Sequence, residues 1–172
     1  LLIPGGGDFE PPRAYPPGVH FDLVPTVQLR CDRRLLSAAL ERELPLLAIC
    51  YGMQLLVEHC GGQLLYDLEQ DRPQLGQHRL DEPDARHGLE VEPGTQLWRA
   101  LGPQPQGVNS RHHQGIADAG PRLRVCGRAG DGLIEAVELP GSAFCLGLQW
   151  HPERMGAEHA KPLFRSFVRA CD

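Results

Sequence analysis

The chain has 172 residues, of which 41% are hydrophobic, and its 17 basic and 22 acidic residues give a net charge of −5. This length and composition predict one globular domain with its own core. The sequence has no basic stripe interleaved with aromatic residues and no apolar run long enough to span a bilayer, which argues against nucleic acid and membrane as partners. Six scattered cysteines without a CxxC pair indicate reduced thiols in a cytoplasmic protein, and the histidine spacing predicts no metal site.

The first half of the chain alternates strand-like and helix-like patterns, which predicts βα units and a parallel sheet. The wholly apolar stretch at residues 46–49 is typical of a central parallel strand buried on both faces. In chain order, the predicted elements are a strand at 1–3, an irregular proline-rich loop at 9–26, an amphipathic helix at 27–43, a strand at 46–49 and a helix at 52–60 that ends at Gly61 and Gly62.

The second half changes to short strand-like segments and closes with a helix. The sequence AGDG at residues 129–132 predicts a hairpin turn. Apolar residues at helical spacing predict the last helix at residues 158–170. The predicted strands of this half lie around residues 87–92, 107–112, 122–128, 133–138 and 144–150. Together the two halves predict an α/β fold over residues 1–172.

Cys50 follows the strand at 46–49 directly and precedes the next helix, in the sequence AICYG. This order fits a nucleophile elbow, whose sharp turn requires small residues two positions before and after the nucleophile; Ala48 and Gly52 satisfy this requirement. A thiol at a helix N-terminus is favoured as the thiolate, so the pattern predicts a reactive Cys50. A buried core cysteine is the alternative interpretation, and this stretch alone does not decide between them.

A thiolate nucleophile needs a base and a group that orients the base. The segment LGLQWHPE at residues 146–153 offers His151 at a strand end and Glu153 two residues later. With Cys50 they would form a triad for acyl transfer, although a surface histidine beside an unrelated carboxylate is the alternative. The turn PGGGD at residues 4–8 exposes backbone N–H groups, and the N–H of Tyr51 is the natural second oxyanion donor.

The motifs PGGGD, AICYGMQLL and LQWHPE, in this order, resemble the class I glutamine amidotransferases. Within that superfamily, VNSRHHQGI at 108–116 and DGLIEAVE at 131–138 look most like the gamma-glutamyl-gamma-aminobutyrate hydrolase branch, also classed as peptidase C26. The resemblance implies a flavodoxin-like, doubly wound and mainly parallel sheet with helices on both faces and a smaller antiparallel region in the second half. It implies hydrolysis of a small-molecule γ-glutamyl amide through a thioester, releasing glutamate and an amine such as 4-aminobutyrate, as in polyamine catabolism. No cofactor and no metal are expected.

The resemblance also assigns roles to particular residues. Cys50 would be the nucleophile, His151 the general base and acid, and Glu153 its orienting partner. The backbone amides of Gly6, Gly7 and Tyr51 would form the oxyanion hole. The residues expected to lie along the substrate are Gln54, His112, His113 and Gln114, although structural hydrogen bonding is as good an interpretation for any one of the last three.

Two alternatives to a free-standing hydrolase stay open. The chain could be a glutaminase subunit that supplies ammonia to a synthase partner, or a catalytically silent binding module on the same fold. The resemblance leaves open whether the protein is a homodimer. It also implies about sixty residues ahead of the PGGGD strand that build the first βα units of the sheet. The sequence lacks these residues, so we expect the chain to be a piece of a longer, normal enzyme.

Overall fold

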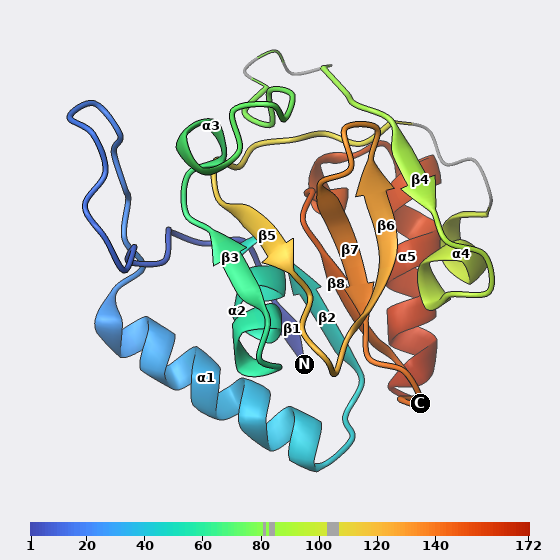
Figure 1. Ribbon diagram of the computed structural model, residues 1–172. Coiled ribbons are helices and arrows are strands. Elements are labelled where there is room, and N and C mark those ends of the chain that lie inside the picture. Colours follow the sequence, from blue (N-terminus) through green and yellow to red (C-terminus); the bar gives the residue numbers. More distant parts are fainter. Residues whose placement is uncertain (81, 83–84, 103–106) are drawn as a thin grey trace.

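The computed structural model describes residues 1–80, 82, 85–102 and 107–172. Its centre is an eight-stranded sheet in the order β1-β2-β8-β7-β5-β3, with β6 paired to β7 and β4 paired to β6 (Figure 1). The strands are β1 (Leu2–Ile3), β2 (Leu46–Ile49), β3 (Gln63–Leu65), β4 (Leu89–Val91), β5 (Gly115–Asp118), β6 (Arg124–Ala129), β7 (Ile134–Glu138) and β8 (Cys145–Leu148). The helices are α1 (Thr26–Glu41), α2 (Tyr51–His59), α3 (Leu68–Asp71), α4 (Gln96–Leu101) and α5 (Ala157–Ala170), with a short 3-10 turn η1 (Pro152–Arg154).

The central strand β2 is buried on both faces, as its apolar sequence predicts. It pairs in parallel with β1 on one side and with β8 on the other. Leu46 and Ala48 pack into the core with α1 and α2, whereas Leu47 and Ile49 pack into the core with α4 and α5. Because successive side chains of a strand point to opposite faces, one four-residue run contributes to both cores. Figure 1 shows the two helix pairs on opposite sides of the sheet.

The predicted α/β class is confirmed, and among the named strands parallel pairing is confined to β1, β2 and β8. The other pairings between named strands are antiparallel, so the described part of the sheet is mixed rather than mainly parallel. The hairpin turn predicted at residues 129–132 joins β6 to β7. There the Ala129 N–H donates to the Leu133 carbonyl at 2.9 Å, and Gly132 adopts a φ of +90° that favours glycine.

The strand predicted around residues 107–112 is wrong. This stretch forms isolated bridges, Val108 with His87 and Arg111 with Arg79, and the regular strand β5 begins later, at Gly115. Polar side chains in this stretch are instead buried and hydrogen-bonded to neighbouring loops. Ser110 Oγ, for example, donates to the His78 carbonyl at 2.6 Å.

Three short elements, β3, α3 and α4, were not predicted from the sequence. Both helices begin at residues that satisfy exposed backbone N–H groups with a side-chain oxygen. Asp67 accepts from the Gln70 N–H at 3.0 Å, and Thr95 accepts from the Trp98 N–H at 3.1 Å. These N-caps were the available signal in the sequence.

The carboxyl ends of β1, β2 and β8 meet at one edge of the sheet. Ile3, Ile49 and Leu148 end these strands, so the glycine turn, Cys50 and the segment containing His151 all leave the sheet at this edge. In open α/β sheets this is the edge at which ligands bind. In the part of the chain that the structure describes, no helix combines the length and the apolar character needed to cross a membrane.

Candidate active site

Cys50 occupies a strained turn between β2 and α2. Its φ of 50° and ψ of −108° lie outside the regions that non-glycine residues favour. The turn also brings Gly52 against β1, where an added Cβ would lie 2.4 Å from the Ile3 carbonyl oxygen. Ala48 is fully buried in the sheet. The small residues on either side of Cys50 are therefore a steric requirement, and the backbone has the geometry of a nucleophile elbow.

The thiol of Cys50 is largely shielded from water, with 9% of the residue exposed. Burial raises the pKa of this thiol to about 12. The Tyr51 N–H opposes the shift, and the carboxylates of Glu135, Glu153 and Asp8 add to it. This raised pKa runs against the expectation of a thiolate at the helix N-terminus, because burial is the largest cause of the shift. The resting group is a thiol that must give up its proton during reaction.

His151 lies beside Cys50, and its ring is oriented by Glu153. The Nδ1 atom of His151 and Oε1 of Glu153 are 2.6 Å apart. An added Cβ at Gly5 would lie 2.7 Å from His151 Cε1 and 3.7 Å from Cys50 Cβ. Gly5 therefore leaves space between these two side chains that any side chain of its own would fill. With Nδ1–H donated to the carboxylate, Nε2 is the ring atom left to accept a proton.

The backbone of His151 is held by Asn109. The His151 N–H donates to Asn109 Oδ1 at 2.9 Å, and Asn109 Nδ2 donates back to the His151 carbonyl at 2.8 Å. Asn109 is itself buried. In the sequence it falls within VNSRHHQGI without an assigned role, because contact between residues 42 positions apart cannot be read from spacing.

A pocket of about 400 Å³ lies over Cys50. Every residue predicted for the oxyanion hole or for substrate contact lines it: Gly6, Gly7, Tyr51, Gln54, His112, His113 and Gln114. The lining also includes residues without a role assigned from the sequence: Asp8, His20, Phe21, Asp22, Arg79 and Arg111.

The glycine turn approaches its neighbours too closely for side chains. A Cβ at Gly6 would lie 3.1 Å from the Tyr51 ring, and one at Gly7 would lie 2.5 Å from the Asp22 carbonyl oxygen. Among the described residues, the N–H groups of Gly6 and Gly7 donate no hydrogen bond to another residue. These amides and the Tyr51 N–H at the start of α2 are thus available to an anionic oxygen in the pocket.

Several polar residues of the pocket wall also hold the wall together. Gln114 accepts from the Phe9 N–H at 2.8 Å and donates to the Phe9 carbonyl at 2.9 Å, so its amide performs the structural role considered as the alternative. Gln54 Nε2 contacts the Gln114 carbonyl and Gln149 Oε1, both at 3.3 Å. Gln149, which lies in the LQWHPE motif without an assigned role, in turn donates to Cys50 Sγ at 3.5 Å.

His113 joins two loops of the pocket wall. Its Nε2 lies 3.0 Å from Asp8 Oδ1, and its Nδ1 lies 3.2 Å from Asp67 Oδ2. The hydrogen bond to Asp8 raises the pKa of His113; burial opposes this, and Asp67 adds to it. The protonated ring therefore connects the glycine turn to the start of α3.

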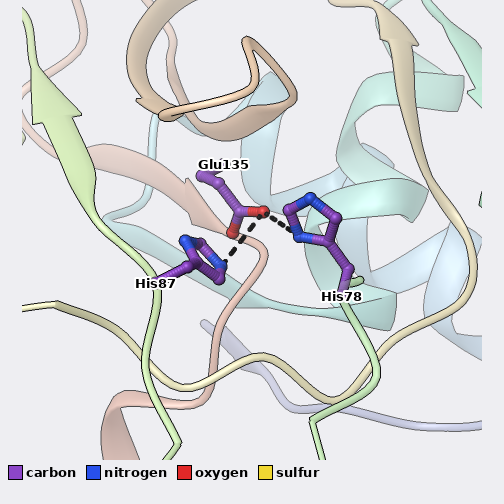
Figure 2. Close-up of side chains that lie close together, drawn as sticks. All are labelled: His78, His87 and Glu135. Atoms are coloured by element: carbon purple, nitrogen blue, oxygen red, sulfur yellow. Dashed lines mark ion pairs between the residues drawn. The ribbon is translucent and has the colours of Figure 1, made fainter. Parts of the chain in front are cut away.

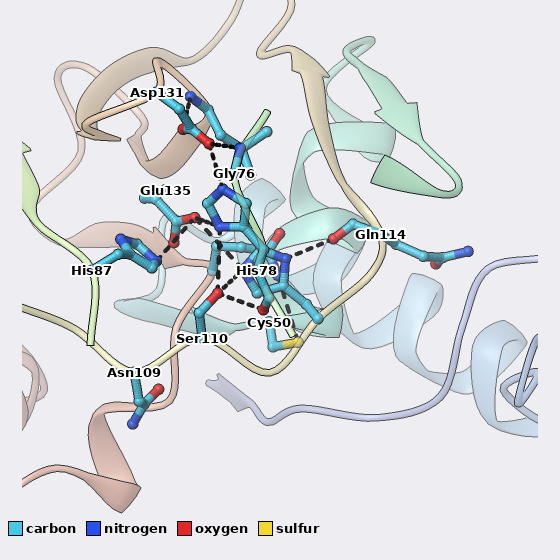
Figure 3. Close-up of polar contacts among 12 residues, drawn as sticks. Cys50, Gly76, His78, His87, Asn109, Ser110, Gln114, Asp131 and Glu135 are labelled. Atoms are coloured by element: carbon cyan, nitrogen blue, oxygen red, sulfur yellow. Dashed lines mark hydrogen bonds and ion pairs between the residues drawn. The ribbon is translucent and has the colours of Figure 1, made fainter. Parts of the chain in front are cut away.

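A second polar cluster is buried behind the pocket, formed by His78, His87 and Glu135 (Figure 2). Figure 3 shows this cluster, which we call the His78 cluster, together with Ser110, Gln114 and Cys50. Burial opposes ionisation of Glu135, but the neighbouring His112 and His78 offset it and lower the pKa of this carboxyl to about 2. The sequence spacing gave no indication of this cluster.

Comparison with known proteins supports the resemblance found in the sequence. The family model of peptidase C26 matches residues 1–153. Gamma-glutamyl-gamma-aminobutyrate hydrolase of Escherichia coli O157:H7 is 43% identical over 148 residues, covering 80% of this chain and 58% of that protein. Protein NtpR of Enterococcus hirae is 35% identical over 178 residues, covering 98% of this chain and 73% of that protein.

A solved structure also shares the fold. The crystal structure of a glutamine amidotransferase from Thermotoga maritima aligns with a TM-score of 0.57 at 19% identity, covering 84% of this chain and 55% of that chain. The chain spans less than three fifths of the length of the E. coli hydrolase it matches. The family model and the sequence identity show that this chain belongs to the peptidase C26 family, within the class I glutamine amidotransferases.

Proposed function

We propose that this chain carries the active site of a hydrolase that cleaves the γ-glutamyl amide bond of a small molecule. One observation carries the proposal. A Cβ added at Gly5 would meet both the His151 ring and Cys50, and His151 Nδ1 lies 2.6 Å from Glu153, so nucleophile, base and orienting carboxylate lie close together beside the pocket that Cys50 lines. The names of the E. coli relatives support the substrate class.

In the first half of the reaction, Cys50 Sγ attacks the γ-carbonyl carbon while its proton passes to His151 Nε2. The pKa of Cys50 is raised to about 12, so this transfer is a necessary part of the attack. The N–H groups of Tyr51 and of the Gly6–Gly7 turn stabilise the oxyanion. His151 then protonates the departing amine, and the C–N bond breaks to leave a γ-glutamyl thioester on Cys50.

In the second half, His151 takes a proton from water, which attacks the thioester carbonyl. The C–S bond breaks, the proton returns to sulfur, and glutamate leaves. Glu153 keeps the same His151 ring orientation through both halves, because one ring must serve as acid and as base.

Two cationic side chains of the pocket wall suit the carboxylates of such a substrate, and Asp8 and Asp22 line the same pocket. Arg79 and Arg111 line the pocket as the two partners of an isolated bridge, and both are exposed. A γ-glutamyl amide carries the glutamyl α-carboxylate, and the amide of 4-aminobutyrate carries a second carboxylate. Guanidinium groups recognise carboxylates through paired hydrogen bonds. We therefore propose γ-glutamyl-4-aminobutyrate as the substrate to test first.

Replacement of Cys50 tests the proposal. The protein is incubated with γ-glutamyl-4-aminobutyrate and, separately, with glutamine; glutamate and ammonia release are measured, and intact mass detects the thioester. We expect Cys50→Ala to abolish turnover and thioester formation, whereas Cys60→Ala, which changes another buried thiol at the end of α2, retains both. Full turnover in Cys50→Ala would disprove the mechanism. Turnover of glutamine but not of the amide would instead indicate an ammonia-supplying glutaminase.

A further inference from the structure

The His78 cluster brings together three side chains from distant parts of the sequence. His78 and His87 lie in the connection between α3 and β4, and Glu135 lies on β7. The side chains of Glu135 and His78 are 0% and 3% exposed, and that of His87 is 18% exposed. Among the described residues, neither oxygen of Glu135 has a hydrogen-bond partner, and neither does Nε2 of His87. A buried carboxylate without such a partner is costly, so the arrangement requires an explanation.

In His78 and His87, the outer ring nitrogen faces away from Glu135 and the inner ring nitrogen faces it. The hydrogen bond made by the outer nitrogen determines whether the inner nitrogen carries a proton in the neutral ring. His87 Nδ1 lies 2.9 Å from the Gly88 carbonyl, which can only accept, so Nδ1 carries the proton. His78 Nε2 lies 2.9 Å from the carboxylate of Asp131 and donates to it. In neutral rings, His87 Nε2 and His78 Nδ1 therefore carry lone pairs, and both atoms lie on the side of Glu135, as the ion-pair lines of Figure 2 indicate. His78 Nδ1 also lies 3.4 Å from Ser110 Oγ. Two lone pairs and a carboxylate facing one another repel unless positive charge offsets them, supplied either by a metal ion or by a proton on a neighbouring ring, His112 included, whose Nε2 lies 3.6 Å from Glu135 Oε1.

The separations within the cluster fit a metal ion better than shared protons. His78 Nδ1 and His87 Nε2 lie 3.4 Å and 3.8 Å from Glu135 Oε1. Histidine–carboxylate hydrogen bonds elsewhere in this molecule are shorter, 2.6 Å in His151–Glu153 and 3.0 Å in His113–Asp8. Ligands at about 2.1 Å from a tetrahedral zinc ion lie about 3.4 Å from one another. The ligand atoms of the cluster all lie within 4.8 Å of one another.

We propose that His78 Nδ1, His87 Nε2 and the carboxylate of Glu135 bind a divalent transition-metal ion, with zinc the ion that this donor set suits best. Two imidazoles and one carboxylate are a common zinc ligand set, whereas magnesium and calcium prefer oxygen ligands. The second oxygen of Glu135, or a water molecule, completes the coordination. This site is separate from the proposed triad and assigns the protein a ligand beyond its proposed substrate.

The surroundings of the cluster match those of a metal site. Asp131 and the Gly88 carbonyl each accept the outer N–H of one ligand histidine, an arrangement that fixes ring orientation and makes the inner nitrogen more basic. The ion would tie the connection between α3 and β4 to β7. Because Arg79 of the pocket wall directly follows His78, binding would also fix the pocket wall.

Zinc titration tests the site directly. The metal-free chain is titrated with Zn²⁺ by calorimetry, and metal content is measured after gel filtration. We expect one zinc per chain, with affinity lowered by more than about 100-fold in His87→Ala and Glu135→Gln and by about 10–100-fold in Asp131→Asn. His59→Ala removes a histidine of α2 outside the cluster and should leave the affinity unchanged. Circular dichroism confirms that each variant is folded.

Cobalt substitution separates this site from adventitious binding by cysteine. Cys31 and Cys171 are exposed, so the titration is repeated in a Cys31→Ser/Cys171→Ser background. We expect Co²⁺ to give visible d–d bands without a thiolate-to-cobalt charge-transfer band, and these bands should be absent in His87→Ala. Equal zinc affinity in His87→Ala and His59→Ala would overturn the proposal. So would the absence of bound zinc in the folded chain, which would leave protonated histidines as the partners of Glu135.

Discussion

Gly5 shows how one residue without a side chain determines the geometry of the candidate site. It lies in the turn after β1, and its Cα faces both Cys50 and the ring of His151. The PGGGD motif in the sequence indicated only a source of backbone N–H groups. The structure adds a steric role, because any Cβ at Gly5 would overlap the ring.

Gly5→Ala is expected to lower turnover by about 100-fold or more, since a displacement of about 1 Å in a catalytic group has effects of that size. The added Cβ would lie 2.7 Å from His151 Cε1, so the ring must move. Steady-state kinetics and thermal unfolding measure the two effects separately. Gly130→Ala is the matched control, because nothing lies within 4 Å of a Cβ there. Unchanged turnover in Gly5→Ala would show that the His151 ring is not held at this position during reaction.

At the level of elements, the pocket wall is held by a pair of ionic contacts. His113, just before β5, contacts Asp8 of the glycine turn and Asp67, which caps α3. The His113 backbone also contacts α3, because the Leu68 N–H donates to the His113 carbonyl at 2.8 Å, so the ring adds a direct connection from this segment to the glycine turn. Its pKa is raised, chiefly by the hydrogen bond to Asp8.

The contribution of His113 to stability should depend on pH. Because its folded-state pKa is raised above 6.5, the contribution is complete below pH 6.5 and is lost as the pH rises through the folded-state pKa. We expect wild type to be more stable than His113→Gln by about 1 kcal/mol at pH 6, a difference that narrows toward pH 9. Urea unfolding at several pH values measures it, with His59→Gln as the control. A difference that is constant with pH would contradict the ionic role.

At the scale of the whole molecule, one sheet separates two hydrophobic cores. The core around α1 and α2 includes Leu46 and Ala48, and the core around α4 and α5 includes Leu47 and Ile49. Cys50 follows this strand and His151 follows the neighbouring β8, so packing on both faces positions the candidate site.

Leu47→Ala should lower the free energy of unfolding by about 2–5 kcal/mol, because it leaves a cavity at a fully buried position. Leu44→Ala, just before the same strand, should change it by less than about 0.5 kcal/mol, since Leu44 is 46% exposed. Urea unfolding of both variants provides the comparison. Similar losses at the two positions would mean that β2 does not lie between the two cores.

Local patterns in the sequence predicted the regular elements that carry strong periodicity. The strand at residues 46–49 matches β2 residue for residue, and the helices predicted at 27–43 and 158–170 correspond to α1 and α5. An apolar run or a helical repeat reports directly on burial, so these elements could be predicted from neighbouring residues alone. The short elements β3, α3 and α4 have too few residues to show the period of a helix or strand. The polar stretch at 107–112 was interpreted as a strand from the sequence but forms isolated bridges.

The sequence by itself determined the α/β class, the elbow around Cys50 and the candidate triad, because each depends on residues close together in the chain or on motifs in a fixed order. The tertiary structure alone revealed Gly5 against His151, Asn109 on the His151 backbone and the His78 cluster. It also shows that Cys50 is buried, and burial raises the pKa of its thiol. The physical reason is that contacts between distant segments and desolvation arise when the chain packs, and residue spacing does not encode them.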